Sequence, residues 1–237
     1  MALLDEGAAA NGTPRVVEHL LIGPPRKVSE MLPGEAGELL QRHGVKFSEL
    51  KAIVIGLGPG SFTGLRIGLA TVKALAYAVK VPLMGVSSLA AAALEGPEDT
   101  TLLPIAVARA QDLYVGHYRR EGQALTQLSP EDAADPAGIA QLCLQREGSV
   151  LLGPAVAEYR AQLESLGVPA DRLLDAGAVP SAVALGTLAL HKGLPQGYDA
   201  QSIFALEPHY IRGSGAERNP KFPPLPGPVP AARLKED

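Results

Sequence analysis

The five histidines of this chain are the first residues to consider for chemistry, because imidazole serves as a metal ligand and as a general base. No two of them stand three or four positions apart, the spacing that places two metal ligands on one face of a helix. We expect each to be a surface or packing residue: His19, His43, His117, His191 and His209.

The single cysteine, Cys143, has no local motif of a nucleophile and is expected to be a small core residue. The adjacent carboxylates Asp5 and Glu6, and Glu131 and Asp132, stand in segments that resemble loops and are expected to be solvated. The sequence therefore shows no catalytic constellation.

A glycine-rich turn is the second candidate for chemistry. Gly56, Gly58 and Gly60 follow the apolar run at 52–55, and Ser61 is placed to cap the next helix. A strand, a glycine turn and a helix start together form a nest of backbone amides that favours anions. A phosphate bound there would contact Gly58, Gly60, Ser61 and Thr63. For Ser61 and Thr63, helix capping is the simpler interpretation.

This turn does not match the common nucleotide or esterase motifs. A dinucleotide-binding motif would have a glycine in place of Ser61 and an acidic residue in the region 80–86, which has none. A P-loop requires a lysine after Gly64, where the chain has Leu65. The residues around Ser61 also fail the Gly-x-Ser-x-Gly pattern of a nucleophile elbow.

The helix predicted at 61–80 follows the turn and is unusually apolar. Its central part has only three strongly polar residues, Arg66, Thr71 and Lys73, so almost no face of the helix suits water. A sheet can cover only one side of such a helix, and Gly64 and Gly68, one turn apart, would let another backbone approach closely. We therefore predict a partner-binding face, with the contact residues Phe62, Gly64, Leu65, Arg66, Gly68, Leu69 and Val72.

Composition excludes several classes of protein. With 46% hydrophobic and 19% charged residues, the 237-residue chain is typical of a globular protein with a substantial core. A net charge of −4 and 4% aromatic residues argue against a broad nucleic-acid footprint on this chain alone. We expect no membrane span, because the helix at 65–79 is too short and carries a lysine, and no secretion signal. These features, together with the lone cysteine, predict a cytoplasmic protein.

The order of predicted elements indicates two α/β halves. The first half is assigned to 1–97 and the second to 98–213, with a boundary in the polar stretch Gly96–Asp99. Residues 214–237 form a proline-rich tail that is expected to be flexible. Strands are predicted at 1–5, 15–22, 52–55, 81–86, 101–108, 113–119, 150–152 and 173–175, and helices at 29–43, 61–80, 87–94, 139–146, 156–166 and 183–191.

The run from Gly58 to Gly68, GPGSFTGLRIG, strongly resembles the signature of the TsaB (YeaZ) family of bacterial tRNA threonylcarbamoyladenosine biosynthesis proteins. The similarity continues through 81–89, through Ala108-Arg109 and Tyr114, and through the segment 207–212, EPHYIR. It covers about residues 1–213. The first motif is long and specific, and the others support it.

This resemblance implies an actin-like/Hsp70-like (ASKHA) fold of two related α/β halves. It also implies a catalytically silent relative of TsaD, the metal-binding subunit that transfers threonylcarbamoyl to adenosine in tRNA. The implied partners are a TsaD-like transferase and a TsaE-like ATPase, with tRNA reached only through the complex and a homodimer when the chain is alone. No cofactor is implied for the chain by itself, and ATP or ADP is implied only for the complex. In the family, the helix after the glycine turn contributes to the dimer contact.

The chain departs from the family pattern at two places. The family's first strand, which carries an Asp-Thr-Ser turn at the centre of the sheet, is absent, and residues 1–5 resemble the second strand instead. Either the start site was assigned too late or the first half is compromised. Val107 stands where the family has an aspartate, so no role of that acid can be transferred.

The leading hypothesis from the sequence is a non-catalytic scaffold that holds and activates a TsaD-like transferase. An enzyme remains the alternative, either an actin-like-fold nucleotide phosphotransferase that uses the nest at Gly58–Thr63 or a glycoprotease-like protein. A third hypothesis is a binding module that works through the proline-rich tail.

Overall fold

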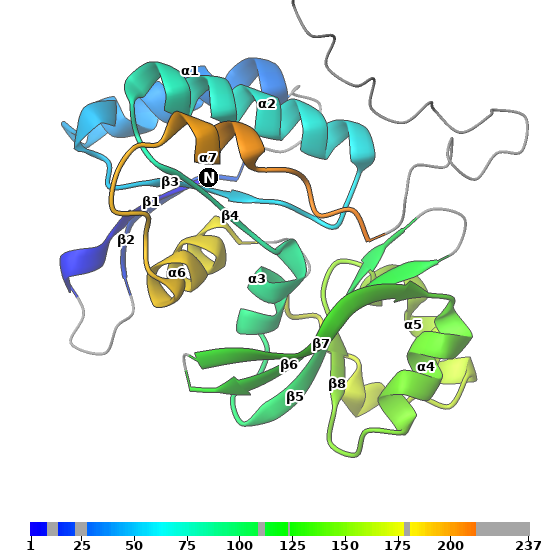
Figure 1. The fold of residues 1–237 in the computed structure, drawn as a ribbon. Helices are drawn as coiled ribbons and strands as arrows, with labels where there is room; N and C mark the ends of the chain where they lie inside the picture. The colour runs from blue at the N-terminus through cyan, green and yellow to red at the C-terminus, as the bar shows by residue number, and fades with distance from the viewer. Residues whose placement is uncertain (9–13, 22–27, 109–111, 123, 178–180, 212–237) are drawn as a thin grey trace, which may run out of the picture.

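The structure is a computed structural model that describes residues 1–8, 14–21, 28–108, 112–122, 124–177 and 181–211. Figure 1 shows two α/β halves, one containing β1 to β4 and the other β5 to β8. This arrangement confirms the predicted fold class. The predicted tail at 214–237 lies outside the described residues.

The strands of the first half form two separate pairs. β1 (Ala2–Asp5) and β2 (Arg15–His19) are antiparallel. β3 (Ile53–Gly56) and β4 (Leu83–Val86) are parallel, and Ile53 lies opposite Leu83. Within the described part of the chain, no strand joins the two pairs into one sheet.

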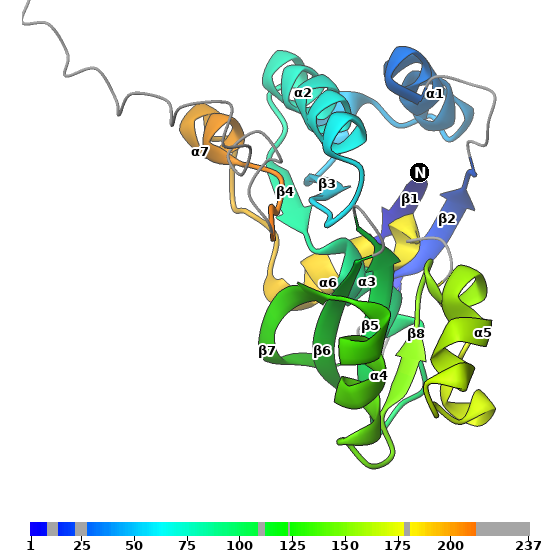
Figure 2. The same ribbon diagram turned by 90° about the vertical axis from the view of Figure 1, so that its right-hand side faces the viewer.

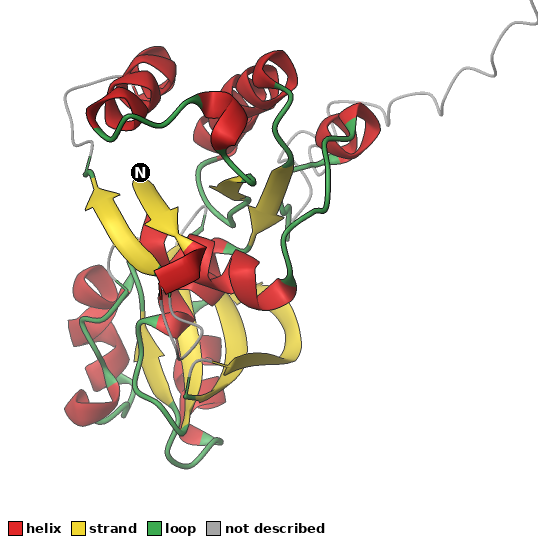
Figure 3. Ribbon diagram, turned by 90° about the vertical axis from the view of Figure 1, so that its left-hand side faces the viewer, coloured by secondary structure: helices red, strands yellow, loops and turns green. Residues whose placement is uncertain are grey.

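Helices lie on both sides of these strands. α1 (Val28–Arg42) and α2 (Phe62–Val79) lie on one side, and α6 (Ala182–Lys192) lies on the other, as Figures 1 and 3 show. α6 contacts all four strands of the first half, so it spans both pairs. α2 begins after Ser61, whose Oγ accepts a hydrogen bond of 3.3 Å from the Gly64 amide, as the capping interpretation predicted.

The second half contains one mixed sheet in the order β7-β6-β5-β8. Three of its strands are antiparallel, and only β8 runs parallel to β5, with Leu103 opposite Leu151. The strands are β5 (Thr100–Val107), β6 (Leu113–Glu121), β7 (Ala124–Ala134) and β8 (Val150–Leu152).

Alternation along β5 determines what each face of this sheet contacts. Leu103 and Ile105 pack against α4 (Pro136–Leu144) and α5 (Val156–Ser165). Leu102 and Ala106 face the opposite way and join the core that includes α3 (Ser88–Leu94). Figure 2 shows α4 and α5 against this sheet, with α3 near its junction with the first half. α3 thus links the two halves.

The late part of the chain returns to the first half. α6 packs on β3 and β4, and α7 (Ala200–Ala205) packs on α2. The predicted boundary at 96–99 separates the strands of the two halves, whereas residues 98–213 supply helices to both.

Two elements were not predicted from the sequence, β7 and α7. β7 contains Pro130 and an acidic pair, which are typical of loops. However, β7 is an edge strand, and proline is tolerated there because one side of the strand has no neighbour to hydrogen-bond with. α7 has only six residues, too few for a periodic pattern, and is started by Asp199, which accepts hydrogen bonds from the amides of Gln201 and Ser202. The predicted strand at 173–175 is wrong, because only an isolated bridge joins Leu173 to Leu151. Short 3₁₀ turns are formed by Glu6–Ala8, Phe47–Glu49 and Ala170–Arg172.

Candidate interaction surface and inter-half cluster

One side of α2 is buried in the protein's own core. Leu69, Val72 and Ala76 are 5%, 7% and 0% exposed, and the latter two pack with Leu83 of β4 and Ile203 of α7. These positions follow the three- and four-residue spacing of a single helix face.

The opposite side of α2 is apolar and exposed. Ile67 and Tyr77 are 45% and 44% exposed. Between them, Ala70 and Ala74 are also exposed, which gives a strip of small and large apolar side chains along the helix. We call Ile67, Ala70, Ala74 and Tyr77 the outer strip. Phe62, which is 39% exposed, lies beside this strip at the start of the helix, against Arg66 and Tyr210. Contiguous exposed apolar side chains make this strip a candidate interaction surface.

The structure divides the predicted contact residues into two groups. Phe62, Gly64 and Arg66 are exposed, and Leu65 and Gly68 are half-buried, so all five are accessible to a partner. Leu69 and Val72 are buried in the chain's own core and offer a partner little surface, and their role as contact residues stays a prediction. Because apolar residues lie on most faces of this helix, the sequence could not tell which face the sheet would cover. Sequence reasoning also missed Ile67, Ala70, Ala74 and Tyr77, although their three- and four-residue spacing was a usable signal.

Three cations on α2 hold the C-terminal segment Tyr198–Tyr210 along one edge of this surface. Arg66 Nε donates a 2.8 Å hydrogen bond to the Tyr210 hydroxyl, and its guanidinium lies 4.0 Å from the Phe62 ring centre. Lys73 Nζ donates to the Phe204 carbonyl at 2.8 Å. Lys80, the residue that ends the helix, lies over the rings of Tyr77 and Tyr198. The exposed rings along this edge add to the apolar area available to a partner.

The glycine turn is tied to its neighbours by hydrogen bonds. The amide of Gly58 donates to Ser88 Oγ at 3.2 Å, and the Ser88 amide donates back to the Gly58 carbonyl at 2.8 Å. Ser61 Oγ caps α2, whereas Thr63 is exposed and Gly60 is half-buried. The Gly58 amide and the Ser61 hydroxyl of the predicted nest therefore already make hydrogen bonds within the fold. Phosphate binding at this turn stays a prediction.

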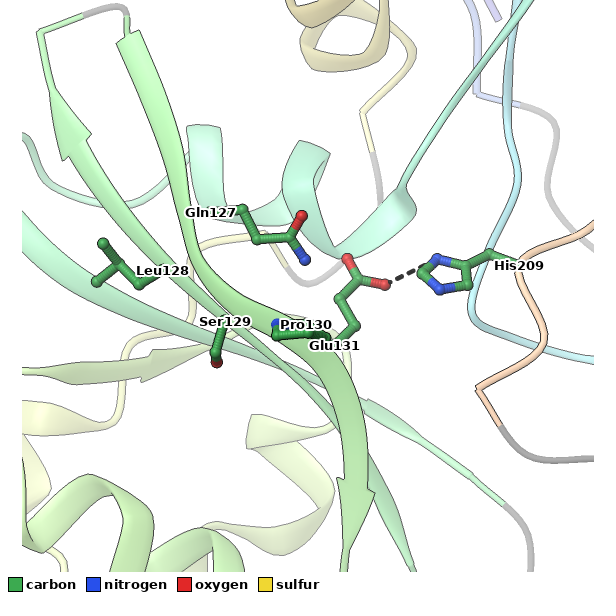
Figure 4. A pocket seen from close by; sticks show the side chains of 6 residues that line it. All are labelled: Gln127, Leu128, Ser129, Pro130, Glu131 and His209. Atoms are coloured by element: carbon green, nitrogen blue, oxygen red, sulfur yellow. Dashed lines mark ion pairs between the residues drawn. The ribbon is translucent and has the colours of Figure 1, made fainter.

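A polar cluster lies where the two halves meet, centred on Glu131 of β7. The Glu131 side chain is 1% exposed, so the prediction that this carboxylate is solvated is wrong. Glu131 Oε1 accepts hydrogen bonds from Ser87 Oγ, at the start of α3, and from the Tyr118 hydroxyl of β6. His209 Nδ1, from the C-terminal segment, lies 3.1 Å from Glu131 Oε2, and Figure 4 shows this pair. Burial, and the Glu131 charge beside it, raise the pKa of Tyr118 well above its ordinary value.

The same segment that carries His209 also contacts the first half. The His209 amide donates to the Leu57 carbonyl beside the glycine turn at 2.9 Å. The Tyr210 ring lies 5.4 Å from the Phe62 ring. Residues 209–210 therefore touch the glycine turn, α2 and β7 at once.

Three further titratable residues make contacts within the fold or lie in its core. His43 Nε2 pairs with Glu18 at 2.6 Å, and His117 contacts Ser129. Cys143 is fully buried, and this burial raises the pKa of its thiol, which confirms the prediction of a core residue. In the described ranges, no group of three His, Cys, Asp or Glu side chains could hold a metal ion.

By length and composition alone, α2 could cross a membrane. Its buried side, however, packs on β4 and α7 in the manner of a surface helix on a globular domain. α2 is therefore a surface helix of the first half.

Comparison with known proteins gives a consistent result. The family model named TsaD, tRNA N6-adenosine threonylcarbamoyltransferase, matches residues 25–219. The "tRNA threonylcarbamoyladenosine biosynthesis protein TsaB" of Bacillus subtilis is 30% identical over 178 residues, which are 71% of this chain and 72% of that protein. The Escherichia coli protein of the same name is 32% identical over 100 residues, which are 41% of this chain and 43% of that protein.

Solved structures with a similar fold come from Pseudomonas aeruginosa. "YeaZ from Pseudomonas aeruginosa" has a TM-score of 0.67 and 26% identity, covering 88% of this chain and 92% of that one. A crystal structure described as an uncharacterized protein with similarity to peptidase YEAZ has a TM-score of 0.67 and 27% identity, covering 89% and 93%.

Proposed function

This chain belongs to the TsaB (YeaZ) family of tRNA threonylcarbamoyladenosine biosynthesis proteins, and from that membership we propose that it is a non-catalytic subunit of the complex that transfers threonylcarbamoyl to adenosine in tRNA. Its partner would be a TsaD-like transferase, which it holds and activates. The observation that carries this proposal is the outer strip of α2, an apolar surface that the chain's own fold leaves exposed.

Physical chemistry supports a protein partner at this strip. Burial of apolar area contributes roughly 25 cal/mol for each Å² removed from water, and aromatic residues and Arg dominate the energetics of interfaces. Phe62, Tyr77 and Arg66 stand on or beside the strip. The small Ala70 and Ala74 between them would let a partner helix approach closely.

A reconstituted reaction tests the proposal. The host's TsaD-like and TsaE-like proteins are combined with tRNA and the threonylcarbamoyl donor, with or without this chain, and threonylcarbamoyl transfer is measured. We expect transfer to require the chain and to be lost with Ile67→Asp, which places a charge in the outer strip. The matched control is Leu144→Asp, because Leu144 is 44% exposed at the end of α4 in the second half. Equal transfer without the chain would refute the scaffold role.

The other components follow from the same proposal. The TsaE-like ATPase would join the complex, and ATP or ADP would act there, while this chain alone would need no cofactor. tRNA would be reached through the complex, and the protein would work in the cytoplasm. In the absence of the transferase, the outer strip would bind a second copy of this chain, since the same apolar area is then uncovered. Sedimentation of the isolated chain with and without Ile67→Asp measures that dimer.

An enzyme is the second candidate, because the glycine turn retains exposed groups and one structural relative is described by its similarity to a peptidase. ATP hydrolysis by the isolated chain, abolished by Thr63→Ala and unaffected by Ile67→Asp, would favour a phosphotransferase over a scaffold.

A further inference from the structure

The outward side of α2 has the residue pattern of a helix that packs along another helix. The residues of the outer strip are spaced three, four and three positions apart, which is the a/d pattern of an apolar seam between two helices that cross at about 20°. Each cation of the helix stands at the g position of the same seven-residue repeat: Arg66, Lys73 and Lys80. At a rise of 1.5 Å per residue, this row of cations flanks the seam over about 21 Å.

The three cations are held in place by uncharged oxygen atoms. In sequence order, they donate hydrogen bonds to the Tyr210 hydroxyl, the Phe204 carbonyl and the Tyr198 hydroxyl. These contacts fix the side chains beside the seam, but neutral acceptors do not cancel the positive charges. A guanidinium has five N–H donors and an ammonium has three, so each cation keeps donors for a further acceptor.

A pocket lies between the first two cations of the row. Its volume is about 260 Å³, and its lining includes charged Arg66, Lys73 and Glu207 and apolar Leu69, Leu206 and Pro208. Two cations and one carboxylate give the lining a net positive charge. Such a pocket fits a side chain with an apolar stem and an anionic end, which in a protein partner is Glu or Asp.

A second copy of this chain does not match the cation row. From Phe62 to Val79, α2 contains no Asp or Glu. A second α2 packed along the seam would place cations against cations, or against the small uncharged residues Gly64, Thr71 and Ala78 on the other edge of the seam. Like charges brought together disfavour association and so select against the wrong partner.

We propose that the outer strip selects a helix of the TsaD-like transferase that carries Asp or Glu at seven-residue spacing beside its own apolar seam. These carboxylates pair with Arg66, Lys73 and Lys80, and one of them enters the pocket between the first two cations. The same row weakens self-association, so it directs the chain toward the transferase. This inference rests on the proposed function, because it takes the transferase as the occupant of the strip.

Salt should act in opposite directions on the two kinds of complex. Dissociation constants are measured by titration calorimetry for the transferase and by sedimentation for the homodimer, at about 50 mM and about 400 mM NaCl. Salt screens the attraction between the cations and the carboxylates, so transferase binding should weaken several-fold. It also screens the repulsion between two cation rows, so the homodimer should tighten. A transferase affinity that does not fall with salt would overturn the proposal.

Variants of Lys73 assign the effect to the cation row. Lys73→Gln should weaken transferase binding about 2- to 5-fold at low salt, and Lys73→Arg, which keeps the charge, should bind more tightly than Lys73→Gln. Near 400 mM NaCl, Lys73→Gln and the unchanged chain should differ little, whereas a loss caused by release of the C-terminal segment would persist. Lys80→Gln, at an exposed position, repeats the test at the end of the helix. The control is Lys192→Gln, because Lys192 is exposed at the end of α6, on the other side of the strands. Equal affinities of Lys73→Gln, Lys80→Gln and the control would contradict the proposal.

Carbodiimide cross-linking identifies the carboxylates directly, because it joins a lysine amine to a carboxylate in contact with it. We expect mass spectrometry to find Lys73 and Lys80 joined to Asp or Glu residues at seven-residue spacing in one helix of the transferase. A complex that forms without these cross-links would overturn this inference and leave the proposed function intact, whereas failure of the complex to form would refute both. Cross-links from Lys73 to a second copy, or tRNA binding by the isolated chain that is lost with Lys73→Gln, would assign the row to another partner and overturn the proposal.

Discussion

Replacing Gly68 with alanine separates the stability of the chain from its association with a partner. Gly68 lies within α2, and a Cβ atom built there would meet no atom within 4 Å. In the isolated chain the substitution should therefore stabilise the helix by about 0.5–1 kcal/mol, because alanine loses less backbone entropy than glycine. For a chain of this size, that gain corresponds to a rise in melting temperature of about 1–4 °C.

Association should change in the opposite direction. If a partner backbone packs against Gly68, the added methyl group overpacks the contact and costs about 1–3 kcal/mol. The dissociation constant should then rise roughly 5- to 150-fold. Differential scanning calorimetry of the isolated chain and titration calorimetry with the TsaD-like protein measure the two effects.

Gly37→Ala in α1 is the control for this experiment, because Gly37 is also helical with no atom within 4 Å of an added Cβ. It should raise the melting temperature to a similar extent and leave the dissociation constant unchanged. A lower melting temperature for Gly68→Ala would show that the chain's own fold needs this glycine. An unchanged dissociation constant would refute close packing at this position.

Four further predictions concern the fold. Glu131→Ala leaves the buried Tyr118 hydroxyl without its acceptor, so it should lower the free energy of unfolding by about 1–3 kcal/mol in urea titrations. Gly153→Ala should destabilise the chain by about 2 kcal/mol, because the φ angle of Gly153 is 103° and the new Cβ would lie 2.8 Å from the Ile105 carbonyl oxygen. Thermal melting measures this effect. An unchanged melting temperature would contradict the predicted strain. Burial raises the pKa of Cys143 above its ordinary value of 9.0, so the native thiol should resist iodoacetamide at that pH and react quickly in urea. Because the unfolded chain loses this proton first, stability should also fall as pH rises above 9.0.

The sequence predicted those parts of the fold that depend on local patterns. Helix α2, its Ser61 cap and strand β3 all follow from short-range signals, namely apolar runs and capping residues. β7 could not be predicted, because Pro130 and the acidic pair argue against a strand except at a sheet edge, and edge position is a tertiary property.

The candidate sites also depend on tertiary contacts that local sequence patterns do not reveal. The apolar character of α2 predicted a partner surface, but its orientation came only from the packing of Leu69 and Val72 against the core. The Glu131 cluster joins residues that lie far apart in the chain, Ser87 and His209 among them. No local pattern marks such a cluster, and the loop-like sequence around Glu131 pointed to solvent instead.

Cysteine footprinting of the outer strip tests the central claim most directly. The native Cys143 is buried, so a new thiol at an exposed position can be followed on its own. Ala70→Cys lies in the outer strip, and Ala161→Cys lies at an exposed position on α5 in the second half. Alkylation rates are measured with and without the TsaD-like protein. The account predicts that this protein slows alkylation at position 70 and leaves position 161 unchanged. Equal rates at position 70 in a complex that demonstrably forms would show that the partner binds elsewhere.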